Sequence, residues 1–81
     1  MTEQEAIHLA TDYAQKHRYP IGPIVYTKRT SWKFRIEDNS STDMWLVEFI
    51  NKYHPAPDYD PGTLLFLVNV TTQEVKFDLV P

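Results

Sequence analysis

The sequence predicts an α+β fold, in which one N-terminal helix packs on a four-stranded antiparallel β-meander. Three observations lead to this prediction. Apolar residues recur with a helical period near the N-terminus, the period changes to two after Pro23, and polar turns separate the later apolar runs. Sequential strands with short connections usually pair antiparallel. A helix over one face of such a sheet is the smallest two-layer arrangement of this class.

The predicted helix covers residues 3–18. Thr2 and Glu5 have the spacing of a capping box, in which each side chain binds a free backbone amide of the first turn. Tyr19-Pro20 is expected to end the helix, because the residue before a proline is disfavoured in the helical region. At about 100° per residue one face is apolar. That face holds Ala6, Ile7, Leu9, Ala10, Tyr13, Ala14 and His17.

Four strands are predicted at residues 24–37, 44–50, 63–70 and 74–80. In the first, Trp32, Phe34 and Ile36 alternate with charged residues, so these three side chains are expected to face the core. The run from Leu64 to Val68 is apolar at every position, which is typical of a central strand covered on both faces or of a dimer interface. A homodimer through the sheet is therefore one hypothesis.

Length and composition limit the classes of function. The 81 residues are predicted to form a single domain, residues 1–81. The absence of cysteine excludes disulfides, thiolate metal sites and thiol nucleophiles. Eleven acidic and eight basic residues give a net charge of −3, which argues against a nucleic-acid partner. The N-terminus has no signal-peptide pattern, and no apolar run reaches the roughly 20 residues of a membrane span. A cytoplasmic protein without membrane association is predicted.

Several short motifs resemble a known family pattern. The helix carries alanines at positions 6, 10 and 14, a strand reads Trp45-Leu46-Val47-Glu48-Phe49, and the last hairpin reads Val68-Asn69-Val70-Thr71-Thr72-Gln73-Glu74-Val75. Together they resemble the PepSY-like and NTF2-like immunity-protein pattern, which is broadly cystatin-like. Asn69 and Gln73 depart from the aspartate and glycine of that pattern, so the hairpin turn is expected to differ. The resemblance implies a non-enzymatic inhibitory, immunity or ligand-binding module, and it carries over no catalytic residue.

The segment from Lys52 to Gly62 is longer than a usual hairpin loop, and its prolines make it stiff. A stiff aromatic loop loses little entropy on binding, so it is a candidate protein interface, although a purely structural loop is the preferred interpretation. Its candidate binding residues are Tyr53, His54, Asp58, Tyr59 and Asp60. The acidic residues and the histidine lack an established metal-ligand spacing, so no metal or other cofactor is predicted.

A second cluster contains basic residues interleaved with aromatic ones: Lys28, Arg29, Lys33 and Arg35 around Trp32 and Phe34. Nucleic-acid stacking surfaces combine these types on one face. Regular strand alternation, however, places Lys33 and Arg35 opposite the aromatic side chains, so a solvated strand face is the preferred interpretation. Glu48 interrupts an apolar strand and is expected to point outward.

The hypothesis ranked first is a non-enzymatic module that binds a protein through the segment at residues 52–62, with an inhibitor or immunity-type partner as one form of it. The alternative is a small-molecule binder with a pocket between the helix and the sheet. That pocket would be lined by Tyr13, Trp32, Trp45 and Phe49. No nucleophile, base and orienting acid are grouped in the sequence, so an enzyme ranks third and no catalytic residue is predicted.

Overall fold

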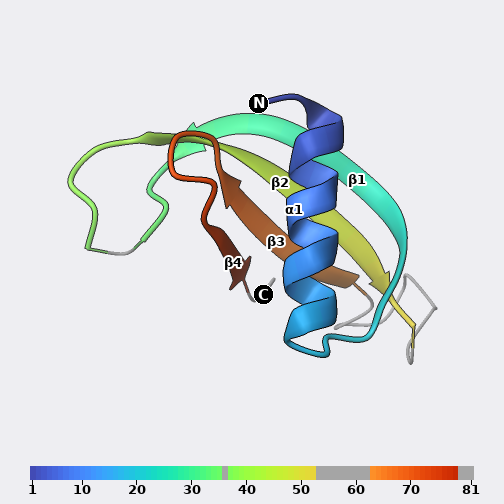
Figure 1. Ribbon diagram of the computed structural model, residues 1–81. Coiled ribbons are helices and arrows are strands. Elements are labelled where there is room, and N and C mark those ends of the chain that lie inside the picture. Colours follow the sequence, from blue (N-terminus) through green and yellow to red (C-terminus); the bar gives the residue numbers. More distant parts are fainter. Residues whose placement is uncertain (36, 53–62, 79–81) are drawn as a thin grey trace.

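The computed structural model of the protein describes residues 1–35, 37–52 and 63–78. In these ranges one helix, α1 (Glu3–Lys16), precedes four strands, which are β1 (Ile21–Trp32), β2 (Thr42–Asn51), β3 (Thr63–Asn69) and β4 (Val75–Asp78). The strands form one antiparallel sheet in the order β1-β2-β3-β4. Figure 1 shows α1 lying across one face of the curved sheet. The predicted α+β meander is therefore confirmed.

Both ends of α1 have well-defined capping geometry. Thr2 and Glu5 form the predicted capping box, in which the Thr2 amide donates to Glu5 Oε1 at 2.9 Å and the Glu5 amide donates to Thr2 Oγ1 at 3.2 Å. The helix ends two residues earlier than expected. Arg18 has φ 61°, and the Tyr19 amide donates to the carbonyl oxygen of Ala14 at 2.8 Å. This is a Schellman motif with a non-glycine residue in the left-handed conformation.

The main core lies between α1 and the sheet. Ala6, Ala10 and Ala14 have no solvent exposure, and their small side chains let the helix backbone approach the sheet. The side chains that meet them come from the middle strands: Val47, Phe49, Leu64, Phe66 and Val68. Half-buried side chains of α1 and the outer strands surround this centre, including Ile7, Leu9, Tyr13 and Phe77. The helix face follows the prediction, except that His17 is an exposed capping residue.

The connection between β1 and β2 differs most from the sequence prediction. The first strand was predicted to run from residue 24 to residue 37, but β1 covers Ile21–Trp32. Phe34 is buried at 3% exposure in the connection that follows, where it packs with Met44 and Leu67 on the sheet face opposite α1. Ile36 lies outside the described residues. The alternation of apolar and charged residues thus continues past the point where the chain leaves the sheet.

The turn between β3 and β4 is built around Asn69. Its side-chain oxygen accepts hydrogen bonds from the amides of Thr71 and Thr72 at 2.9 and 3.1 Å. The Gln73 amide donates to the Asn69 carbonyl oxygen at 2.9 Å, and Gln73 has φ 64°. Gln73 therefore adopts the left-handed conformation that favours glycine.

Candidate functional site

The sheet face opposite α1, here called the open face, has no helix over it in the described part of the chain. Strand pairing defines its residues row by row across the sheet. One row is Lys28–Leu46–Leu67–Lys76, and the next is Tyr26–Glu48–Leu65–Asp78. The face therefore has leucines on its two middle strands and polar or charged residues on most outer positions. Glu48 points away from α1, as the alternation predicts.

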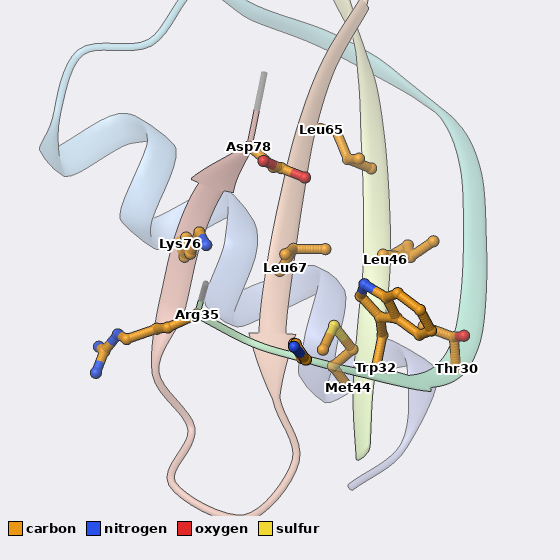
Figure 2. A pocket seen from close by; sticks show the side chains of 10 residues that line it. Thr30, Trp32, Arg35, Met44, Leu46, Leu65, Leu67, Lys76 and Asp78 are labelled. Carbon is orange, nitrogen blue, oxygen red and sulfur yellow. The ribbon is translucent and has the colours of Figure 1, made fainter. Parts of the chain in front are cut away.

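A hollow of about 510 Å³ lies on this open face. Its floor comes from β2 and β3, through Met44, Leu46, Leu65 and Leu67. Its rim comes from β1, the β1–β2 connection and β4: Thr30, Trp32, Lys33, Arg35, Lys76 and Asp78. Figure 2 shows the Trp32 ring above the floor near Leu46, with Lys76 and Asp78 on the β4 side. We call this site the open-face hollow.

The β1–β2 connection closes one end of the hollow. Figure 2 shows the chain after β1 crossing over β2 and β3 toward β4. Lys76 Nζ donates to the Phe34 carbonyl oxygen at 2.8 Å, and Arg35 forms an ion pair with Glu74. The Arg35 backbone amide also donates to Asp38 Oδ2 at 2.9 Å. These contacts hold Phe34 over Met44 and Leu67, so the crossing segment is part of the wall.

Among the described residues, Trp32 is the most exposed of the large apolar side chains, with 68% of its surface accessible. The expectation that it faces the core was wrong, because its position on β1 pairs with Thr42 and belongs to the open face. Trp32 is also separated from its predicted pocket partners. Phe49 and Tyr13 belong to the cluster on the helix side, and Trp45 packs against the same cluster.

The basic residues have a different arrangement from the one predicted. Lys33 and Arg35 lie after the end of β1 and line the same hollow as Trp32, not the opposite face. Lys28 is on the open face as well, whereas Arg29 points to the helix side, within 6.0 Å of the Trp45 ring and 3.5 Å from Asp43. Figure 2 shows the Arg35 side chain pointing away from the floor. The geometric argument against a mixed aromatic and basic surface therefore fails.

The predicted binding residues of the segment at residues 52–62 lie outside the described residues: Tyr53, His54, Asp58, Tyr59 and Asp60. Within the described ranges no group of three histidine, cysteine or acidic side chains is placed to hold a metal ion. His8 and His17 are exposed on α1 and its cap.

Sequence reasoning did not identify Leu46, Leu65, Leu67, Lys76 and Asp78 as site residues. The signal was present in part, since Leu65 and Leu67 make β3 apolar on the face away from α1. In the sequence, that pattern predicts a covered strand or a dimer interface. The structure covers Leu67 with Phe34 and leaves Leu65 half-buried at the floor of the hollow.

Comparisons of the chain with known protein families, with curated proteins and with solved structures found no match. Within the described residues, no helix combines the length and apolar character needed to span a bilayer. A function is therefore inferred from the geometry of the open-face hollow.

Proposed function

We propose that this protein is a small, non-enzymatic module that binds a partner protein through its open face. The observation that carries the proposal is the combination of an exposed tryptophan, Trp32, with a leucine-floored hollow beside it. Tryptophan is among the residues most enriched at binding hot spots, and hot spots lie in pockets that the partner fills. An inhibitory or immunity-type role, as the sequence resemblance implies, would use such a surface to cover part of the partner.

The rigidity of the site supports this proposal. The floor is part of a hydrogen-bonded sheet, and the wall is fixed by the contacts of Phe34, Arg35 and Lys76. A site that is already ordered loses less conformational entropy when a partner binds. A partner that fills the hollow would also remove the apolar surface of Leu46 and Leu65 from water, which favours association.

A photo-crosslinking experiment tests the proposal. The photoreactive residue p-benzoylphenylalanine is placed at position 32 in one variant, and at position 15, on the exposed outer side of α1, in a control variant. We expect a crosslinked protein from the native lysate at position 32 and none at position 15. The captured protein is then purified, and Trp32→Ala is expected to weaken its binding by at least about tenfold, as hot-spot truncations do. Equal crosslinking at both positions would contradict the proposal.

A small-molecule ligand is the second candidate, and the size of the hollow favours it. A volume of about 510 Å³ lies within the roughly 300–1,000 Å³ of typical ligand pockets. The site differs from the one expected from sequence, because it lies on the other face of the sheet. Mass spectrometry of the purified protein under native conditions would reveal a retained ligand, which should be lost in Trp32→Ala.

A further inference from the structure

We infer that the open-face hollow, together with Lys28 beside it on the same face, binds an extended acidic segment of the partner, in which an apolar side chain lies between two carboxylates in an acid-x-apolar-x-acid pattern. The inference rests on the proposed function and adds the chemistry of the partner. The juxtaposition that leads to it is the row Lys28–Leu46–Leu67–Lys76, in which a lysine stands at each end of a leucine pair.

The spacing of the pattern follows from the sheet. Neighbouring strands are about 4.8 Å apart, so the three steps from β1 to β4 place the two lysine positions roughly 14 Å apart. An extended chain advances about 3.3 Å per residue, and roughly four residues cover that distance. Residues i, i+2 and i+4 of an extended segment point to the same side. Acids at i and i+4 would then meet the lysines while the apolar residue at i+2 meets the leucines.

The floor and wall suit an apolar side chain at the central position. Leu46 and Leu67 form the middle of the row, and Leu65 continues the apolar surface into the next row. Trp32 stands beside the row at the β1 side, where its exposed ring offers a face or an edge to an aromatic side chain. A phenylalanine at position i+2 would therefore be enclosed on more than one side.

The lysines retain hydrogen-bonding capacity for carboxylates. Within the described ranges, the side chains of Lys28 and Lys33 have no ion-pair or hydrogen-bond partner. Lys76 Nζ uses one donor on the Phe34 carbonyl oxygen, and an ammonium group has three. Lys33 lies at the closed end of the hollow, where it adds to the positive charge facing the segment. Arg35 contributes less, because it is paired with Glu74.

The charges also distinguish the acidic segment from other occupants. Two copies of this chain stacked with the rows in register would place lysine against lysine at both ends, which is unfavourable for a dimer through this face. A nucleic acid would extend beyond the row, and Glu48 and Asp78 in the next row would repel its phosphates. Glu48 and Asp78 lie one row away from the lysines, so a five-residue acidic segment confined to the lysine row, with an apolar centre on the leucines, fits the arrangement best.

The test uses the full chain and synthetic peptides, with binding followed by the amide signals in an NMR titration. The probe is the blocked heptapeptide Ser-Asp-Ser-Phe-Ser-Asp-Ser. Matched controls replace both aspartates by lysine, or phenylalanine by alanine, and a twelve-nucleotide oligo(dT) represents nucleic acid. We expect the probe to shift the amides of the row residues and of Trp32, and to bind more weakly as salt concentration rises.

Charge-reversal variants localise the binding. Lys28→Glu is expected to lower the affinity for the probe peptide by about three- to tenfold, which is the effect of reversing one exposed charge pair. Lys16→Glu, on the exposed side of α1, is the matched control and should leave binding unchanged. Trp32→Ala should also lower the affinity for the probe peptide. It should leave the fold intact, because the ring is mostly exposed.

Several outcomes would overturn the inference. These are no shift with the probe, equal binding of the lysine peptide or of oligo(dT), and equal affinity for wild type and Lys28→Glu. If a partner protein crosslinks at position 32 while the probe fails in this way, the proposed function stands and the acidic-segment inference is wrong. If neither the partner nor the probe binds, both are wrong.

Discussion

Lys76 Nζ donates a hydrogen bond to the carbonyl oxygen of Phe34 at 2.8 Å, although the two residues are 42 positions apart in the chain. The same ammonium lies 5.8 Å from the centre of the Phe34 ring. This contact ties the last described strand to the connection between the first two. It fixes the segment that forms one wall of the open-face hollow.

Phe34 is expected to contribute to stability, whereas Trp32, two positions earlier, is not. Phe34→Ala removes a side chain with 3% exposure that packs on Met44 and Leu67. We expect the free energy of unfolding to fall by about 3 kcal/mol, the lower end of the range for buried phenylalanine. Trp32→Ala, at 68% exposure, should change it by no more than about 0.5 kcal/mol. Urea denaturation measures the free energy of unfolding of both variants. An equal decrease in both would contradict the prediction.

The alanine face of α1 is expected to tolerate no larger side chain. Ala10 is fully buried against the sheet, so Ala10→Leu must displace the helix or strain its neighbours. Overpacking of this kind costs about 1–3 kcal/mol in the free energy of unfolding. Gln15→Leu, on the exposed side of the same helix, is the control and should stay within about 0.5 kcal/mol of wild type. Denaturation midpoints that shift equally in both variants would show that close helix packing is not required.

Gln73→Gly is expected to stabilise the protein. Gln73 has φ 64° in the β3–β4 turn, and the left-handed region costs a non-glycine residue roughly 1 kcal/mol. Glycine removes this strain but makes the unfolded chain more flexible, so a net gain of about 0.5 kcal/mol is expected in thermal or urea unfolding. Thr72→Gly, at the preceding turn position, is the comparison and should destabilise. A loss of stability in Gln73→Gly would mean that the Gln73 side chain makes a contribution larger than the strain.

The capping box predicts a pH dependence of stability. The backbone amide of Thr2, followed by its hydroxyl, holds the pKa of Glu5 below its ordinary value of 4.5. A carboxyl group with a lowered pKa in the folded state stabilises at neutral pH, and this contribution is lost as the pH falls through the folded-state pKa. Wild type should therefore be more stable than Glu5→Gln at pH 7, with a smaller difference at a pH below 4.5. Thermal unfolding at both pH values measures it, and a difference that does not change with pH would contradict the prediction.

The sequence was sufficient to predict the helix, its capping box and the three later strands to within a few residues. These features depend on local rules, namely the capping spacing of Thr2 and Glu5 and the alternation around Val47 and Phe49. It was not sufficient to locate Phe34 or Trp32. A period of two shows which side chains avoid water, but it does not show whether the chain is still in the sheet. Phe34 avoids water by crossing over the open face, and this depends on contacts with Leu67 and Lys76 far along the chain.

The open-face hollow was missed for the same reason. Its floor and rim are joined by strand register and by the crossing connection, and neither is encoded in a contiguous motif. Lys28 and Lys76 are 48 positions apart, and each appears in the sequence as an ordinary exposed charge. Their shared row becomes visible when β1 to β4 are paired.

The buried alanine stripe of α1 has a consequence for synthesis in the cell. The helix is synthesised well before Phe66 and Val68, whose side chains cover it. Because a ribosome adds about 5–20 residues per second, the helix waits for seconds without this cover. The helix and the sheet are therefore expected to fold together as a unit, after β3 has been synthesised.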